Sequence, residues 1–187
     1  MRTLLRRAFA VALVLVAGFT SWLIIANHAS VAPPAPAPVS DRSPDYTLRD
    51  AVVTRYDPKG ARRYVLRAQS IAHLPASGAS VFGQPRLDYV AGPGNAWRVT
   101  AERGRLGSDN HLLLLRGKVY GRQLQGDNPL RITTAAAMVQ LDRRIVRSRS
   151  PVRLWREGFQ TDGIGLDADL TSGVVKLLAE VRSRYAP

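Results

Sequence analysis

The residues of this 187-residue sequence that could do chemistry are scattered along the chain. Asp167 and Asp169 have the spacing of paired carboxylates that bind a metal ion or a sugar nucleotide. Three apolar residues, Leu166, Ala168 and Leu170, alternate with them. Because successive side chains of a strand point to opposite faces, this alternation predicts the solvent face of a strand instead of a binding site.

Other patterns of catalytic or metal-binding residues are incomplete. The segment Gly78–Gly83 (GASVFG) misses the nucleophile motif G-x-S-x-G by one position. His73 and His111 are isolated, the chain has no cysteine, and its few glutamates do not select an acid–base pair. We therefore predict no catalytic residue, no metal site and no cofactor. A hydrolase that uses two carboxylates is kept as an alternative.

Arginine dominates the segment Arg143–Glu157 (RRIVRSRSPVRLWRE), and the whole chain has a formal net charge of +13. Such a charge favours an anionic partner, which could be nucleic acid, a lipid headgroup surface or a phosphorylated ligand. Arg147, Arg149 and Arg153 fall on one face of an extended chain, and small or apolar residues fall on the other. We interpret the segment as a strand with an arginine-rich outer face.

The N-terminal segment predicts the compartment. Ala8–Ala26 contains nineteen consecutive uncharged residues, which is about enough for a helix to cross a bilayer, and three arginines precede it. The positive-inside rule keeps the N-terminus in the cytoplasm and sends the following chain across the membrane. Asn27 and His28 spoil a cleavage site, so we expect an uncleaved anchor instead of a signal peptide. Nucleic acid is then not an expected partner.

A proline-rich segment follows the anchor and indicates an extended spacer. No second linker interrupts the remaining chain, which is long enough for one hydrophobic core. We therefore predict four parts: a cytoplasmic N-terminus (residues 1–7), a transmembrane anchor helix (8–28), a proline-rich periplasmic spacer (29–44) and a single β domain (45–187).

Strand signals dominate this domain, because apolar and polar residues alternate in segments such as Trp97–Ala101. Similar units repeat, and each has a small residue followed by a turn and a second strand. These small residues, which lie 33, 34 and 28 positions apart, are Ala68, Ala101, Ala135 and Gly163. A period of this length predicts a stack of β-hairpins.

Two segments, Thr133–Leu141 and Val174–Tyr185, fit a helix as well as a strand, and the repeat favours a strand for both. Three of the second strands contain glycine or proline in mid-run, where we expect a bend or a bulge. Leu112–Leu115 is apolar on both faces, as in a strand that is covered on both sides. A repetitive sheet folded over on itself can leave an apolar groove.

Several short motifs occur in a specific order after the anchor and spacer. They are YDPxG from Tyr56, YxLxA from Tyr64, QP from Gln84, WxVxA from Trp97, LxGxV from Leu115, RITT from Arg131, PVxL from Pro151 and VRxxY from Val181. In this order the chain resembles the LptC family, the single-pass inner-membrane component of the lipopolysaccharide transport machinery.

The resemblance implies an all-β domain in the periplasm, a twisted, open β-jellyroll similar to LptA and OstA. It implies that the domain receives lipopolysaccharide from the inner-membrane ABC transporter LptBFG and passes it to a periplasmic LptA-like bridge protein. The transporter would dock on the N-terminal edge of the sheet at Tyr46, Leu48, Val52 and Val53. The bridge protein would dock on the C-terminal edge at Val175, Leu177, Ala179 and Val181.

The lipid groove is expected to be lined by inward apolar side chains, because exposed acyl chains cost free energy in proportion to their apolar surface. The expected groove residues are Tyr64, Leu66, Trp97, Val99, Leu112, Leu114, Val119, Ile132, Val152 and Leu154. The predicted function is non-enzymatic lipid transport from the inner membrane toward the outer membrane. The alternatives are an anchored periplasmic hydrolase of an anionic glycolipid and a purely structural β-scaffold.

Overall fold

The structure is a computed structural model in which residues 43–90 and 96–185 are described. They belong to a compact unit that spans Ser40–Pro187. The predicted cytoplasmic N-terminus (1–7) and anchor helix (8–28) lie outside the described residues, as does all but the end of the spacer (29–44). Within the described residues, no helix has the length and apolar character needed to cross a membrane.

The regular structure of the described residues consists of strands, as the sequence predicts. The eleven strands are β1 (Tyr46–Tyr56), β2 (Arg62–Leu74), β3 (Ala79–Gly83), β4 (Arg86–Val90), β5 (Ala96–Thr100), β6 (Arg103–Leu106), β7 (Leu112–Gln123), β8 (Arg131–Gln140), β9 (Ile145–Arg156), β10 (Phe159–Asp169) and β11 (Val174–Tyr185). They form one antiparallel sheet in which most neighbours in sequence are neighbours in space. Both segments that also fitted a helix are strands, β8 and β11.

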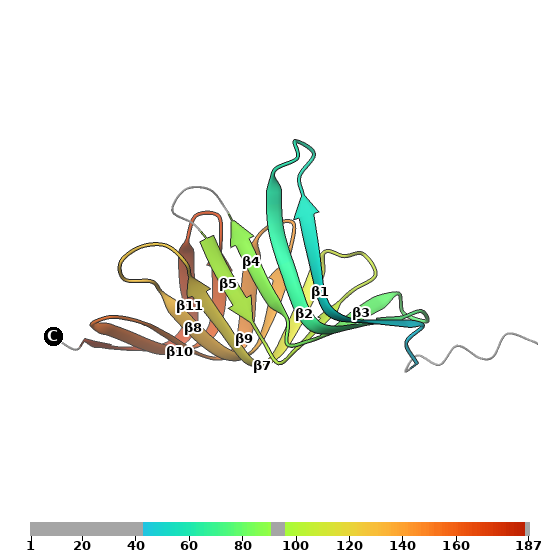
Figure 1. The fold of residues 1–187 in the computed structure, drawn as a ribbon. Helices are drawn as coiled ribbons and strands as arrows, with labels where there is room; N and C mark the ends of the chain where they lie inside the picture. Colours follow the sequence, from blue (N-terminus) through green and yellow to red (C-terminus); the bar gives the residue numbers. More distant parts are fainter. Residues whose placement is uncertain (1–42, 91–95, 186–187) are drawn as a thin grey trace, which may run out of the picture. The chain divides into compact units, whose positions relative to one another are not determined.

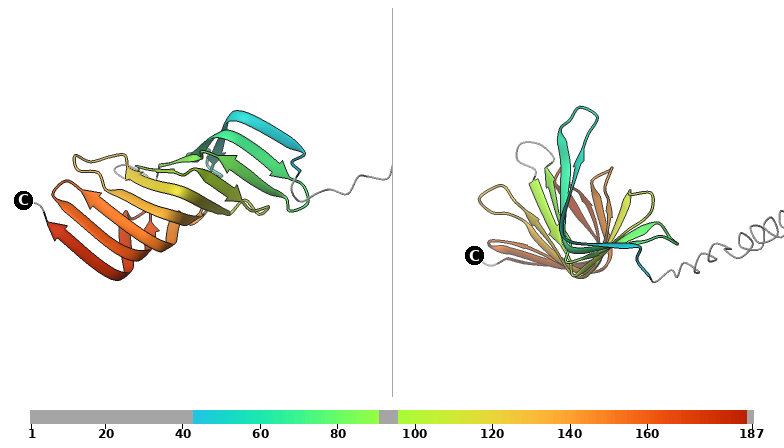
Figure 2. Two further views of the ribbon diagram at one scale, coloured as in Figure 1. Left: turned by 90° about the horizontal axis from the view of Figure 1, so that it is seen from below. Right: turned by 45° about the vertical axis from the view of Figure 1, so that its right-hand side comes forward.

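Long strands cross the whole width of the sheet, and short strands pair with only one half of them. β2 pairs through Tyr64–Arg67 with β4 and through Ser70–Leu74 with β3. β7 divides in the same way between β5 and β6. We call the half that contains β4 and β5 the first wall, and the half that contains β3 and β6 the second wall. Figures 1 and 2 show the walls diverging from a common fold line.

Bulges lie where the long strands pass from one wall to the other. In β7 the register shifts between Arg116 and Val119, and the intervening Gly117 has a φ of 78°. In β10 the register shifts at Gly165, opposite the stretch of β9 that contains Pro151. β3 and β4 are separated by Gln84 and Pro85. The predicted bends at glycine and proline are therefore confirmed, because an extra residue in one strand bends and twists the ladder.

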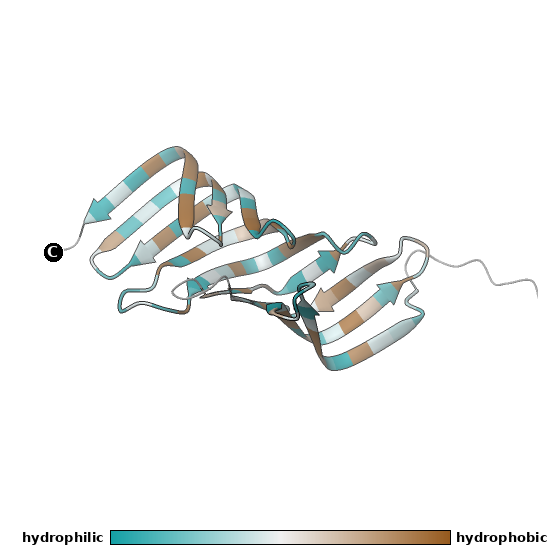
Figure 3. Cartoon of the chain, turned by 90° about the horizontal axis from the view of Figure 1, so that it is seen from above, coloured by the Kyte–Doolittle hydropathy of each residue, from teal (hydrophilic) through white to brown (hydrophobic). Residues whose placement is uncertain are grey.

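The hydrophobic core fills the space between the walls. Trp97 in the first wall is 1% exposed, and Leu113 and Val139 in the second wall are fully buried. Along the strands, buried and exposed residues alternate, and Figure 3 shows the corresponding change of hydropathy from residue to residue. The inner faces of both walls therefore make a single core, and the outer faces are polar.

Two of the inward positions predicted on β7, Leu112 and Leu114, are wrong by one residue, whereas Val119 is buried as predicted. Leu114 is 38% exposed and Leu112 is partly buried, whereas Leu113 and Leu115 point into the core. Leu113 lies opposite the buried Val139 of β8, and this pairing sets the register. A run of four leucines carries no alternation, so only the partner strands decide which parity faces inward.

Candidate functional site

The interior between the walls gathers the other predicted groove residues. Each of them is buried on the inner face of the sheet: Tyr64, Leu66, Trp97, Val99, Val119, Ile132, Val152 and Leu154. They come from strands β2, β5, β7, β8 and β9, so the apolar surface runs along the sheet rather than across one hairpin. A continuous inner face of this kind can bind apolar chains, and their binding to these residues stays a prediction.

In the described conformation the side chains nearly fill this interior. A cavity of about 30 Å³ lies between the walls, lined by Trp97, Val119 and Ile132 from one side and by Val146, Leu166 and Leu170 from the other. Protein interiors are close-packed, and a void of this size holds about one water molecule. A cavity of this size is too small for an acyl chain while the walls keep the described positions.

Two buried hydroxyl groups lie at the fold line beside this cavity. Thr134 Oγ1 is 2.9 Å from Ser148 Oγ and donates a hydrogen bond of 3.0 Å to the carbonyl of Pro151. Ser148 Oγ donates to the carbonyl of Ala136 at 2.7 Å. Both hydroxyl groups donate hydrogen bonds to backbone carbonyls at the bulges, where the ladder hydrogen bonds are interrupted. Their role is to hold the bend.

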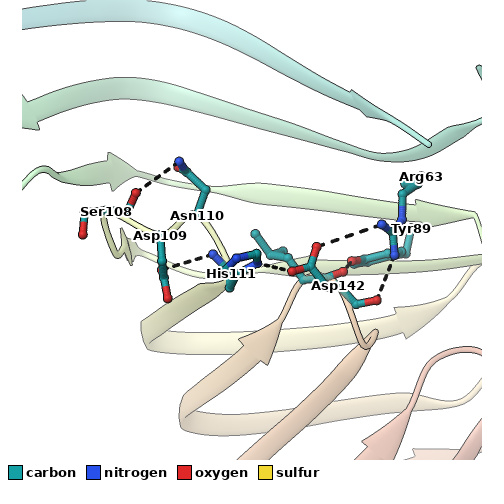
Figure 4. Close-up of polar contacts among 8 residues, drawn as sticks. Arg63, Tyr89, Ser108, Asp109, Asn110, His111 and Asp142 are labelled. Atoms are coloured by element: carbon teal, nitrogen blue, oxygen red, sulfur yellow. Dashed lines mark hydrogen bonds and ion pairs between the residues drawn. The ribbon is translucent and has the colours of Figure 1, made fainter. Parts of the chain in front are cut away.

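A polar contact joins the two walls at one side of the interior, and we call it the interwall clasp. Arg63 Nη2 of the first wall donates a 2.8 Å hydrogen bond to the carbonyl of Asp142, in the turn after β8. The carboxylate of Asp142 lies 4.0 Å from Arg63 Nη1 and also contacts His111 Nδ1. Tyr89 donates its hydroxyl to the carbonyl of Leu141. Figure 4 shows Asp142 between His111 and Arg63.

Burial supports the donor role of the tyrosine in the clasp. Tyr89 is 1% exposed, and desolvation raises the pKa of its hydroxyl well above the ordinary value of 10.0. The hydroxyl therefore stays protonated and can donate to Leu141. His111, which appears isolated in the sequence, lies beside Asp142 only because the β6–β7 and β8–β9 turns are neighbours. No pattern in the sequence predicts that these residues lie together.

Both end strands of the sheet have one edge without a partner strand among the described residues. β1 pairs with β2, and β11 pairs with β10. Leu48 and Val53 of β1 lie opposite the buried Ile71 and Leu66, so they extend the inner face, yet they are 48% and 44% exposed. Of the other residues predicted for this edge, Tyr46 stacks on His73 and Val52 is exposed.

The C-terminal edge has a similar composition. Val175 and Leu177 lie opposite the buried Ala168 and Leu166 and continue the inner face, half-buried. Ala179 pairs with Ile164, and Val181 is 53% exposed. Within the described residues, an apolar inner face therefore reaches an open strand edge at each end of the sheet. Edges of this kind can be extended by a strand of another protein.

The arginine-rich segment is β9, and its predicted orientation is confirmed. Arg147, Arg149 and Arg153 are exposed, whereas the alternate residues of this strand, Val146, Ser148, Val152 and Leu154, are buried. Arg147 Nε lies 3.1 Å from Asp167, and Arg153 Nε lies 2.8 Å from Asp162. The hydrogen bond from Arg153 lowers the pKa of Asp162. The outer arginines thus pair partly with carboxylates of β10.

The pair Asp167 and Asp169 has structural contacts on the outer side of β10. Asp167 pairs with Arg147, and Asp169 Oδ1 accepts a 2.7 Å hydrogen bond from the amide of Thr171 in the following turn. This backbone bond lowers the pKa of Asp169. In the described part of the chain, no three side chains of His, Cys, Asp or Glu are grouped to hold a metal ion.

The sequence matches one protein family over nearly its whole length. The family is described as "Lipopolysaccharide-assembly, LptC-related", and its model matches residues 13–186. The chain belongs to the LptC family. The lipopolysaccharide export system protein LptC of Escherichia coli K12 is 31% identical over 149 residues, which cover 79% of this chain and 78% of that protein. LptC of Haemophilus influenzae is 25% identical over 162 residues, with 76% and 77% coverage.

A solved structure shows the same fold. The crystal structure of LptH from Pseudomonas aeruginosa, the LptA homologous periplasmic component of a lipopolysaccharide transport device, superposes with a TM-score of 0.52. It covers 66% of this chain and 95% of LptH at 12% sequence identity. At this identity the similarity concerns the fold alone. The described sheet of this LptC family member is therefore an LptA-like β-jellyroll, as the resemblance implied.

Proposed function

We propose that this chain is a non-enzymatic lipopolysaccharide transport protein that holds the acyl chains of the lipid between its two walls. One observation carries the proposal: an apolar inner face that continues through the sheet and reaches an open strand edge at both ends. Membership of the LptC family supports lipopolysaccharide as the lipid. Covering the acyl chains stabilises them by about 0.8 kcal/mol for each CH₂ group removed from water.

The two open edges are the expected docking positions of two partner proteins. We propose that the inner-membrane transporter LptBFG docks on the edge of β1, at Tyr46, Leu48, Val52 and Val53. A periplasmic LptA-like bridge protein then docks on the edge of β11, at Val175, Leu177, Ala179 and Val181. Pairing of these edges with strands of the partners would join the apolar inner faces into one path. Energy for the movement would come from the transporter.

The N-terminal segment would attach the domain to the inner membrane. We propose a single-pass anchor at residues 8–28 with the N-terminus in the cytoplasm, on the basis of the nineteen uncharged residues and the preceding arginines. The intact mass of protein extracted from membranes tests this topology. A mature chain that begins between residues 29 and 40 would show that the segment is cleaved.

Site-specific photocrosslinking tests the lipid path. A benzoyl-phenylalanine at an inner position, Val99, Ile132, Val152 or Leu113, is expected to label lipopolysaccharide, as is one at Trp97. The same residue at the outer positions Arg98, Thr100, Arg131, Arg153 and Leu114 is expected not to label it. The reason is that a step of one residue along a strand reverses the face of the side chain.

The experiment also separates the proposal from its alternatives. Equal labelling from both parities would mean nonspecific association, and labelling from the arginine face alone would indicate a membrane-surface protein. A purely structural scaffold would label from no position. Turnover of the glycolipid by the purified full chain would show a hydrolase. Each of these results contradicts transport between the walls.

Proline substitution tests the edge of β11. A proline at Leu177 or Ala179 removes a main-chain donor from the strand, so we expect weaker capture of an LptA-like protein. Threonine at Leu177 keeps the donor and serves as the matched control. Circular dichroism confirms that the sheet is intact in each variant. Unchanged capture by a correctly folded proline variant would place the bridge protein elsewhere.

A further inference from the structure

Trp97 has a buried polar group with no hydrogen-bond partner in the part of the chain that the structure describes. The residue lies on β5 of the first wall, in register with Tyr89 of β4 and Gln123 of β7, and its side chain is 1% exposed. Its indole Nε1 has no hydrogen-bond acceptor among the described residues. The N–H of a buried tryptophan normally finds an acceptor, because an unpaired donor in an apolar interior costs free energy.

The described surroundings of Trp97 are mostly apolar. The indole lines the cavity between the walls together with apolar residues such as Val119, Ile132 and Val146. Thr134, which also lines the cavity, has its hydroxyl hydrogen-bonded to Ser148 and to the carbonyl of Pro151. The indole therefore borders the space that must widen when a lipid enters.

We infer that the indole N–H of Trp97 recognises the carbonyl oxygen of an ester-linked or amide-linked acyl chain bound between the walls. The inference rests on the proposed function, and it adds that the interior recognises the carbonyl group of the acyl linkage. A hydrocarbon chain alone would fill the apolar space and leave the donor unpaired. A phosphate would lose its hydration among apolar side chains, which is costly for a charged group. A carbonyl oxygen is an uncharged acceptor attached to a chain that fits the apolar lining.

Such a donor makes the site selective for the linkage and not only for the chain length. A site with a buried hydrogen-bonding group rejects an analogue that lacks the matching group, because the group of the protein then stays unpaired. We expect an ester-linked lipid to bind about tenfold more tightly than its ether-linked analogue. Trp97 is thus a specificity-determining residue of the lipid site.

The test uses the full chain in detergent, freed of lipopolysaccharide, and two lysophospholipids that differ only in an ester or an ether linkage. Dissociation constants are measured for wild-type protein and for a variant with β-(3-benzothienyl)alanine at position 97. This analogue keeps the shape of tryptophan and replaces the N–H with sulfur. Trp97→Phe is a second variant, and Trp155→Phe, a half-buried tryptophan on β9, is the control.

We expect the preference of about tenfold for the ester in wild-type protein and in Trp155→Phe, and no preference in either variant at position 97. In NMR spectra the indole N–H of Trp97 should shift downfield with the ester lipid and stay unshifted with the ether lipid. The chain has only three tryptophans, so this resonance can be assigned by substitution.

The outcomes separate this inference from the proposed function. Equal binding of both lipids to wild-type protein, with no downfield shift, would overturn the role of Trp97. The indole N–H would then donate to water or have no acceptor. Lipid transport between the walls would still stand. If neither lipid binds to wild-type protein, both the proposed interior site and the role of Trp97 fail.

Discussion

Single residues fix the bend of the sheet, and Gly117 is the clearest case. Its φ of 78° lies in the left-handed region, and a Cβ at this position would come within 2.9 Å of Glu102 Cβ. Gly126 also has a positive φ, of 94°, but a Cβ added there would meet nothing within 4 Å. The two glycines therefore differ in steric contact and share the same backbone requirement.

Alanine at these two glycines measures the two effects separately. We expect Gly117→Ala to lower the free energy of unfolding by about 2 kcal/mol, because it adds a steric contact to the backbone strain. Gly126→Ala should cost about 1 kcal/mol or less, since only the backbone term applies. Denaturant titration of both variants checks this. Equal losses in the free energy of unfolding would mean that Glu102 moves away from the added methyl group at little cost.

At the residue scale, the sequence predicted which side chains face the interior wherever apolar and polar residues alternate. Val99 and Arg98 were placed on the correct faces, and so were the alternating residues of β9. The four leucines Leu112–Leu115 gave no such pattern, and their register was predicted wrongly. Pairing with β8 makes Leu113 and Leu115 the inner residues. That information lies in the partner strand, about twenty-five residues further along the chain.

Strands were predicted from the repeat, but contacts between the walls were not. Arg63 and Asp142 are 79 positions apart, and their contact depends on how far the sheet folds over on itself. Neither residue belongs to a motif that indicates a pair. The twist of each strand and the geometry of each bulge set the angle between the walls, and the sequence of one strand does not encode this angle alone.

The interwall clasp suggests a test of whether the walls must part. Arg63→Cys together with Asp142→Cys places two thiols across the interior in a chain that has no other cysteine. A short bismaleimide suits this pair, because it bridges separations that the strict geometry of a disulfide does not allow. We expect the crosslinked protein to lose most of its lipopolysaccharide binding, since the cavity of about 30 Å³ cannot admit a chain.

The control for this crosslink joins two residues of one wall. Arg122 of β7 and Arg131 of β8 are direct cross-strand partners in the first wall. A crosslink between cysteines at these positions should leave lipid binding unchanged, as should the unreacted Arg63→Cys/Asp142→Cys protein. Binding is measured by photocrosslinking from Val99. Full labelling of the protein crosslinked between the walls would show that lipid enters without their separation.

On the scale of the whole domain, stability is distributed unevenly along the sheet. The centre rests on fully buried apolar residues such as Leu113 and Val139, which do not titrate. The end strands β1 and β11 are mostly exposed, and polar contacts lie beside β1 and in β10. Asp45 Oδ1 lies 2.8 Å from His73 beside β1, and this hydrogen bond lowers the pKa of Asp45. These ends carry the edges proposed to dock partners, and regions with few buried contacts open most easily.

The positions of carboxylates with a lowered pKa predict which strands lose stability first in acid. Asp45, Asp162 and Asp169 all titrate below the ordinary value of 3.8, and all lie in or beside the two strands at each end of the sheet. A lowered folded-state pKa means that the stabilising contribution is present above pH 3.8 and is lost as the pH falls through the folded-state pKa. We therefore expect acid to loosen β1, β10 and β11 before the central strands.

Hydrogen exchange, expressed as protection factors between about pH 5 and about pH 2, measures this order of opening. Protection of β1, β10 and β11 should fall first, and that of β7 and β8 should persist. Asp162→Asn, which removes the charge that Arg153 stabilises, should lower the protection of β10 at pH 5 and weaken its further dependence on pH. Simultaneous loss of protection across all strands would mean that the sheet unfolds as one unit. The end strands would then not open separately from the centre to dock partners.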